Sequence, residues 1–240
     1  MTNKRSDLFH TTRWSIVLGA ADSLNPQAKE RALAELCQSY WPPVYTYLLC
    51  KGYSKVESED LCQGFFTQVL EKKTYVVADA ERGRFRAFLI RSLKNYLSNV
   101  YQRDQALKRG AGNKAICLDK AELEKNFTTM ESPDEAFDKE WAESMVHVTL
   151  DRLRESYSKE GREALFTYLQ NLMIPTTATV SQADLAESLD MTEVAVKSAL
   201  QRMRKSFRTI LREEISQTIS TQDKASIDTE LRYLLDCLRS

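Results

Sequence analysis

Six basic side chains follow one another closely near the C-terminal end of a 240-residue chain whose formal net charge is zero. Between Thr192 and Arg212 they are accompanied by a single acid, Glu193. Cationic side chains neutralise phosphates, and Arg, Lys, Gln, Ser and Glu also bond to base edges in a major groove. This chemistry predicts contacts with nucleic acid, through Glu193, Lys197, Ser198, Gln201, Arg202, Arg204, Lys205 and Arg208. The alternative, an ordinary solvated helix face, would mix the two signs of charge.

These residues need an element that turns them toward the same side. In a helix the polar side chains share one face, and the opposite face is apolar. The apolar residues are Val196, Ala199, Leu200, Met203, Phe207 and Ile210. Upstream, Ser181 and Asp184 predict the start of a shorter helix, and residues 190–192 predict a tight connection in which Thr192 caps the second helix. Two helices joined in this way are typical of a helix-turn-helix, whose second helix enters the major groove.

A second basic segment runs from Arg82 to Arg109, with eight basic residues and one acid. Its periodicity predicts a helix from about Phe85 to Gln105, with one apolar face. Candidate contacts on the other face are Arg84, Phe88, Arg91, Lys94, Asn95 and Tyr101. Aromatic rings among cations and amides suit single-stranded nucleic acid, because each unpaired base offers a face for stacking. The alternative, that Phe88 packs against a neighbouring loop or helix, stays open.

The composition favours an all-α fold. The chain has only seven Gly and five Pro, and it has enough hydrophobic residues, 42%, to build a core in each of two domains. Its five cysteines form no CxxC pair and lie far in sequence from both histidines, so we expect no metal site, no disulfide framework and no cofactor. Cys37, Cys50 and Cys62 fit small buried hydrophobes in a reducing compartment. Without a signal peptide or an apolar membrane-spanning run, we expect a cytoplasmic protein with no membrane partner.

Helical periodicity and changes of charge divide the chain. Residues 1–112 are expected to form a helical bundle, in which Pro42 and Pro43 kink or divide a long helix that ends at Gly52. An acidic linker is expected over 113–136, a helix-turn-helix domain over 137–213 and an extension over 214–240. The last helix, Ile227 to Leu238, is expected to cover the C-terminal core; the alternative is that it binds a regulator.

These features together resemble the sigma-70 family of bacterial transcription initiation factors, in particular the two-domain extracytoplasmic-function type. The segment "SEDLCQGFF" is similar to the family's DLxQxxF motif, and the matching residues are Asp60, Leu61, Gln63 and Phe66. The stretch "GRFRAFLIRSLKNYLSNVYQRD" resembles the promoter-melting region, where Phe88, Leu89 and Asn95 match. It departs from the usual pattern, because Phe88 replaces a Trp, and Asn99 and Gln102 stand where an Asp and an Arg are common.

"LAESLDMTEVAVKSALQRMRKSFR" resembles the family's region that reads the upstream promoter element. The stretches "TTRWSIVLGAADS", "YWPPVYTYLLCKGYS" and "ERGRFRAFL" are similar to a subgroup abundant in planctomycetes. The resemblance implies a region 2-like bundle and a region 4-like helix-turn-helix domain. It also implies binding of core RNA polymerase at the β′ clamp helices and the β flap.

The resemblance implies that the chain is not an enzyme, since catalysis belongs to the polymerase. Its DNA partner would be a promoter, read as a duplex at the minus-35 element and as a melted strand at the minus-10 element. An anti-sigma protein or another regulator is a further partner that the resemblance allows. The alternatives are a LuxR-like regulator, which needs no polymerase-docking face, and an enzyme with an incidental helix-turn-helix. The enzyme is disfavoured, because the sequence shows no phosphate loop, no nucleophile with a positioned base and no metal cluster.

Overall fold

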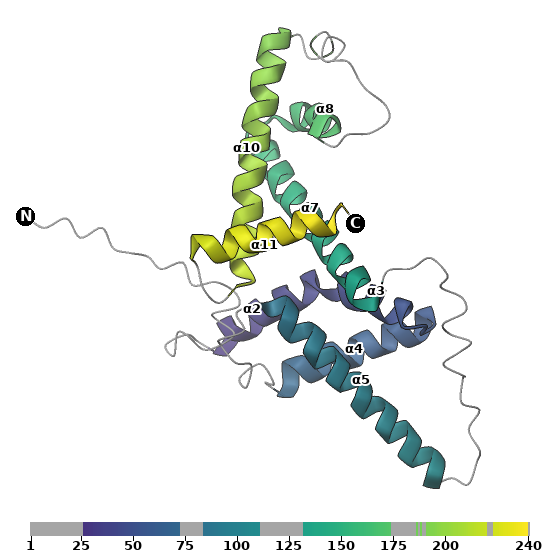
Figure 1. Cartoon of the computed structure of the whole chain (residues 1–240). Coiled ribbons are helices and arrows are strands. Elements are labelled where there is room, and N and C mark those ends of the chain that lie inside the picture. The colour runs from purple at the N-terminus through teal and green to yellow at the C-terminus, as the bar shows by residue number, and fades with distance from the viewer. Residues whose placement is uncertain are drawn as a thin grey trace, which may run out of the picture. The chain divides into compact units, whose positions relative to one another are not determined.

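The computed structural model describes residues 26–72, 84–110, 132–173, 186, 188, 191–219 and 223–239. These residues are mostly helical and contain no strand, which confirms the all-α prediction for this part of the chain. An isolated antiparallel bridge joins Arg84 and Ile219. The helices are α2 (Pro26–Ser39), α3 (Trp41–Cys50), α4 (Lys55–Lys72), α5 (Phe85–Gly110), α7 (Pro133–Lys159), α8 (Glu163–Met173), α10 (Glu193–Gln217) and α11 (Lys224–Cys237) (Figure 1).

The chain divides into two compact units. Unit 1 comprises residues 1–144 together with 216–240, and unit 2 comprises residues 145–215. These bounds differ from the expected ones, because α7 is one continuous helix that supplies residues to both units. Ser132 and Glu135 start α7 with a capping box, in which each side chain bonds the backbone N–H of the other residue. Residues 133–136 of the expected linker are therefore helical, and residues 113–131 lie outside the described part.

The first helices of unit 1 follow local sequence signals. Tyr40 separates α2 from α3, and two prolines occupy the first turn of α3, where the missing N–H groups have no helical partner to lose. Gly52 follows the last residues of α3 and adopts φ 90°. Helices often end with a residue of positive φ, and glycine adopts that conformation most readily. Ser54 and Glu57 then form a capping box that starts α4. The expected division of the long helix near the prolines, and its end at Gly52, are confirmed.

The C-terminal segment returns to unit 1. The Phe85 N–H, at the start of α5, donates to the Thr218 carbonyl oxygen at 3.0 Å. The Asp223 side chain then caps α11 by accepting from the Ser226 N–H at 2.8 Å. The prediction that this helix covers the core of the C-terminal domain was wrong, since its buried residue Glu230 pairs with α5 in unit 1. Helical periodicity shows that α11 has a buried side, but it does not show which surface that side meets.

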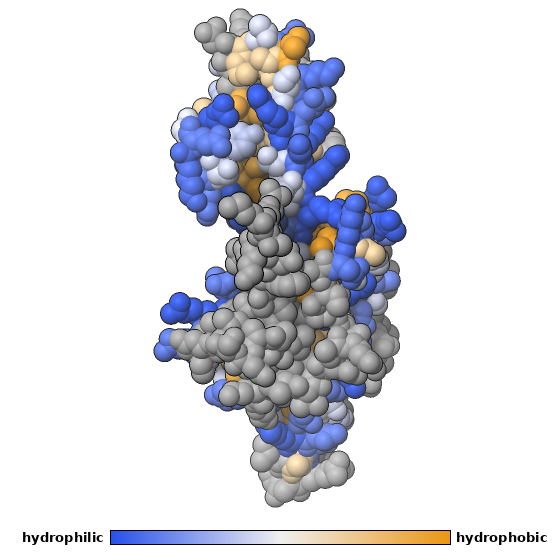
Figure 2. Space-filling view, turned by 90° about the vertical axis from the view of Figure 1, so that its left-hand side faces the viewer, coloured by the Kyte–Doolittle hydropathy of each residue, from blue (hydrophilic) through white to orange (hydrophobic). Residues whose placement is uncertain are grey.

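Unit 2 contains a separate hydrophobic core. It is formed by α7, α8, α10 and the described residue Ala186, and its buried members are Leu153, Phe166, Leu169, Ala186, Val196, Ala199, Leu200 and Met203. The surface of this unit is largely hydrophilic in the view of Figure 2. Among the described helices of the whole chain, none combines the length and the apolar character needed to cross a membrane.

Candidate nucleic-acid interface

The basic helix α10 begins where the sequence predicts. The Thr192 hydroxyl accepts from the Ala195 N–H at 3.2 Å, and the Thr192 carbonyl accepts from the Val196 N–H at 3.0 Å, so Thr192 is the N-cap. The Met191 N–H donates to the Ala186 carbonyl oxygen at 2.9 Å, which closes the tight connection ahead of α10. The predicted cap of the preceding helix, Ser181 with Asp184, lies outside the described residues.

The two faces of α10 are as predicted. Val196, Ala199, Leu200 and Met203 are buried, while Phe207 and Ile210 are half-buried against the same core. The eight candidate contacts are all exposed: Glu193, Lys197, Ser198, Gln201, Arg202, Arg204, Lys205 and Arg208. A rigid helix whose apolar side is fixed in a core thus presents seven polar or cationic side chains and one acid to solvent.

Two arginines of unit 2 hold α10 in place. The Arg204 guanidinium donates to the Leu172 carbonyl oxygen at 3.3 Å, near the end of α8, where a cation also complements the helix dipole. Arg152 of α7 pairs with Glu213 at 3.1 Å and also with the buried Glu214. Burial alone would lower the pKa of Arg152, but its pairing with Glu214 and Glu213 raises that pKa overall. Arg204 therefore has a structural contact in addition to its predicted phosphate contact.

The second predicted interface lies on α5, which is anchored by its apolar face. Phe85, Leu89 and Leu93 are buried in unit 1. Arg91, Lys94, Asn95 and Tyr101 are exposed, and Arg84 and Phe88 are half-buried. The rings of Phe85 and Phe88 lie 6.0 Å apart, so Phe88 has a packing partner within its own helix. The sequence left that packing open, and the structure shows that Phe88 is partly inside and partly accessible.

Arg84, just before α5, and Arg86, in its first turn, belong to one ionic cluster, of which Arg86 and Glu230 are buried. The Arg86 side chain is 10% exposed and contacts Asp138 of α7 at 2.6 Å and Glu230 of α11 at 3.3 Å. Glu230 also pairs with Arg84 at 3.1 Å. Burial would lower the pKa of Arg86, but the two carboxylates outweigh it and raise that pKa. Two cations and two carboxylates balance in this cluster, so Arg84 is engaged by the protein itself.

Aromatic rings enclose the same guanidinium. Arg86 lies 4.3 Å from the centre of the Tyr233 ring and 5.0 Å from that of Trp141, at cation–π distance from both. The Tyr233 hydroxyl donates to the second oxygen of Asp138 at 2.5 Å. Burial, followed by that bond, raises the pKa of Tyr233. We refer to Arg84, Arg86, Asp138, Glu230 and Tyr233 as the Arg86 cluster.

Another cation of the predicted strand-binding face is also paired. Lys94 contacts both oxygens of Asp134 at 2.9 Å, and the two side chains are 50% and 48% exposed. The expected acidic linker contributes Asp134, within its described end, to an ion pair with α5, and Asp138, just beyond that linker, contributes to another. Such a half-exposed pair contributes about 0–1 kcal/mol, so Lys94 exchanges partners at little cost.

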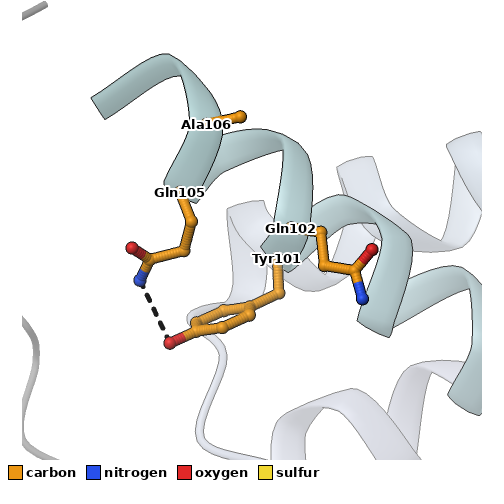
Figure 3. A pocket seen from close by; sticks show the side chains of 4 residues that line it. All are labelled: Tyr101, Gln102, Gln105 and Ala106. Carbon is orange, nitrogen blue, oxygen red and sulfur yellow. Dashed lines mark hydrogen bonds between the residues drawn. The ribbon is translucent and has the colours of Figure 1, made fainter. Parts of the chain in front are cut away.

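The C-terminal half of α5 projects away from α2, α3 and α4 (Figure 1). Tyr101 is 63% exposed, and its hydroxyl accepts from the Gln105 side-chain amide at 3.0 Å. Figure 3 shows these two side chains with Gln102 and Ala106 around a hollow of about 270 Å³. An accessible ring bordered by two amides offers a stacking face and hydrogen-bonding groups together.

The predicted polymerase-binding residues lie on α4 at different depths. Asp60 and Gln63 are exposed, Leu61 is half-buried and Phe66 is 5% exposed. The Phe66 ring stacks on Trp41 of α3 at 5.5 Å and 19°. Trp41 itself is 38% exposed, as is Leu70 one turn beyond Phe66. The apolar residues Cys62, Phe65, Phe66 and Val69 of α4 are thus packed within unit 1, and Trp41 rather than Phe66 is at the surface.

The acidic partners of α5 and the cover of Trp41 over Phe66 were not predicted from the sequence. The sequence holds a local signal for each. Ser132 with Glu135 is a capping box that predicts the start of a helix within the expected linker. The proline pair after Trp41 predicts a helix start there, which places Trp41 on a separate helix from Phe66. The pairing of Arg86 with Glu230 has no local signal. Within the described part of the chain, no group of three or more His, Cys, Asp or Glu side chains is arranged to hold a metal ion.

Comparison of the chain with protein family models, curated proteins and solved structures found no match.

Proposed function

We propose that this chain is a promoter-specificity subunit of a bacterial RNA polymerase, acting in the cytoplasm as an alternative sigma factor of the extracytoplasmic-function type. One observation carries the proposal: α10 is capped at Thr192, buries one face in its own core and exposes a row of cations with one amide on the other. A helix held in this way suits the major groove of duplex DNA. The polymerase would supply the catalysis.

The upstream promoter element would be read by the first turns of α10. Arg202 and Gln201 have the donors and acceptors to bond to guanine and adenine edges, and Lys197 and Ser198 lie one turn ahead of them. Lys205 and Arg208 would contact phosphates, which fixes the register without reading sequence. Arg204 would share its guanidinium between a phosphate and the end of α8, since it already donates to Leu172.

Capture of the melted strand would fall to α5. Arg91, Asn95 and Tyr101 are exposed, and Phe88 is accessible on one side. Stacking of a base on an aromatic ring contributes about 1–3 kcal/mol, which compares with the few kcal/mol that unpairing costs. Lys94 would leave Asp134 for a phosphate at little cost, whereas Arg84 is held by the buried carboxylate of Glu230.

Core polymerase would bind at the exposed side of α4, through Asp60 and Gln63 with Trp41 and Leu70 beside them. A second candidate function is favoured by the burial of Phe66, which removes one matching residue from the surface. A LuxR-like DNA-binding regulator needs α10 but has no use for a docking face. A pull-down with core polymerase separates the two, because replacing Asp60 and Gln63 by Ala weakens capture only in a polymerase-binding protein.

The test of the proposal is transcription in vitro. The purified chain is mixed with core RNA polymerase lacking any sigma factor and with fragments of the source genome, and the transcripts are sequenced. Defined new start sites that share two spaced upstream elements are expected. The same reaction without the chain is the control. Duplex binding with no new start site and no capture of polymerase would overturn the proposal in favour of the regulator.

A further inference from the structure

A valine stands in the middle of the polar face of α10. Val194 is 74% exposed, the largest exposed fraction among the large hydrophobic side chains that lie at the surface of the described residues. It is in the first turn of the helix, just after the Thr192 cap. Single exposed hydrophobic residues are common on protein surfaces. The position of this one relative to the candidate DNA contacts makes it informative.

The helix geometry places Val194 opposite the core. At 3.6 residues per turn it lies within about 20° of Gln201 and Lys205 around the helix axis and about 180° from the buried Met203. Lys197 and Ser198, three and four residues further on, flank it on the two sides. On the side of α10 that faces away from the core, the apolar side chain of Val194 is therefore surrounded by cations, an amide and a hydroxyl.

The stability of α10 gives no reason for a valine here. A β-branched residue is a poorer helix former than Ala, which occupies the next position, and the side chain contributes nothing to the buried core. An apolar protein partner is a poor fit as well, because docking would bury Lys197 and Lys205 without compensation. The major groove accommodates both kinds of group, since phosphates line it and the C5-methyl of thymine is its exposed apolar group.

We propose that Val194 contacts the C5-methyl group of a thymine in the major groove, and that it is a specificity-determining residue of α10. The inference rests on the proposed function, since it assumes that this helix enters duplex DNA. It adds a prediction about sequence: the bound element contains a thymine whose methyl group, rather than its hydrogen-bonding edge, is recognised. Gln201 and Lys197 would then read or anchor the neighbouring positions.

The test removes only the methyl group. Duplexes are selected from a random-sequence pool by the full chain, alone and together with core RNA polymerase. Each thymine of the selected duplex is then replaced in turn by deoxyuridine, which lacks the methyl and keeps every hydrogen-bonding group. At one thymine the substitution is expected to weaken binding about fourfold, the effect of exposing one buried methyl group.

The variant Val194→Ala shows whether that thymine is the partner of Val194. Its affinity for the thymine duplex is expected to fall by a similar factor, with no further loss when the same thymine becomes deoxyuridine. Val56→Ala is the matched control, since Val56 is 68% exposed on α4, outside α10. This control is expected to keep the full response to deoxyuridine.

Two other outcomes overturn the inference, and they differ in what else they overturn. If a duplex is selected but no deoxyuridine substitution couples to Val194, the valine reads no methyl group and the proposed function is untouched. If neither the chain alone nor its mixture with core polymerase selects any duplex, the proposed function fails together with the inference.

Discussion

Replacement of Arg86 by Met is expected to destabilise unit 1 by about 3–5 kcal/mol, because it removes the cation that the carboxylates of Asp138 and Glu230 share in a buried ion cluster. Met fills a similar volume, so the change acts mainly on charge. It leaves Asp138, with a side chain 13% exposed, and Glu230, 1% exposed, facing the space that the guanidinium occupied. Arg84 remains beside Glu230, and among the described residues Asp138 keeps the bond from the Tyr233 hydroxyl.

Unit 2 contains no tryptophan, and Trp41 and Trp141 report on unit 1. The chain has three Trp, at positions 14, 41 and 141, and unit 2 spans residues 145–215. Urea unfolding followed by Trp emission therefore measures unit 1, while circular dichroism at 222 nm measures both units. With a slope of about 2 kcal/mol per M, the expected loss moves the Trp-detected midpoint down by about 2 M.

Arg154→Met is the matched control. Arg154 also lies over a ring, Phe166 at 5.4 Å, but its side chain is 52% exposed and it belongs to unit 2. It is expected to cost less than about 1 kcal/mol and to leave the Trp-detected transition in place. The reasoning is refuted if Arg86→Met moves that transition no further than Arg154→Met does. A triple replacement of Arg86, Asp138 and Glu230 by apolar residues is expected to recover most of the loss, since the three buried charges are then gone and Arg84, which loses Glu230, has a side chain that is 36% exposed.

Three further predictions follow from other contacts. A methyl group at Gly64 would overlap the Tyr96 hydroxyl, so Gly64→Ala is expected to lower the free energy of unfolding of unit 1 by about 1–3 kcal/mol, measured by urea unfolding. In a Tyr96→Phe background the same change is expected to be neutral or to stabilise by up to about 1 kcal/mol, the helix preference of Ala over Gly. Burial raises the pKa of the Cys37 and Cys62 thiols to about 12, so both are expected to resist iodoacetamide at pH 8 until the protein unfolds, as peptide mapping would show. Because these folded-state values lie above the ordinary 9.0, their contribution to stability is complete below pH 9 and is lost as the pH rises toward 12. Arg202→Ala is expected to weaken binding to the selected duplex by about 1–3 kcal/mol and to relax selectivity at one base pair, measured by competition among single-base variants.

Each of these predictions has a result that contradicts it. An equal effect of Gly64→Ala with and without the Tyr96 hydroxyl would show that the hydroxyl is not the obstacle. Labelling of Cys62 at the rate of a small thiol in the native protein would show that α4 opens readily. For Arg202, the control is Arg162→Ala, an exposed arginine outside α10, which should leave affinity and selectivity unchanged. Unchanged selectivity in Arg202→Ala itself would make that residue a phosphate contact or no contact.

Local sequence patterns predicted the fold of α10 well, since the period of its apolar residues and the Thr192 cap act within one helix. The same kind of pattern predicted the apolar face of α5. It could not predict that Glu230 meets Arg86, because the two residues are 144 positions apart and both look like ordinary surface charges in sequence. The burial of Phe66 was missed for a similar reason: its cover, Trp41, belongs to a different helix.

Because residues 216–240 belong to unit 1, the two units cannot be completed in the order in which they begin along the chain. Proteins usually fold from the N-terminus as they are made. Here residues 145–215 have all been synthesised before the ribosome reaches Thr218 and Glu230, so unit 2 can close while unit 1 is still incomplete. A nascent chain that stalls between residues 218 and 230 already contains α10, but its Arg86 still lacks the carboxylate of Glu230. Quality-control proteases would find the weak part of such a chain in its first half, although the missing residues are at its end.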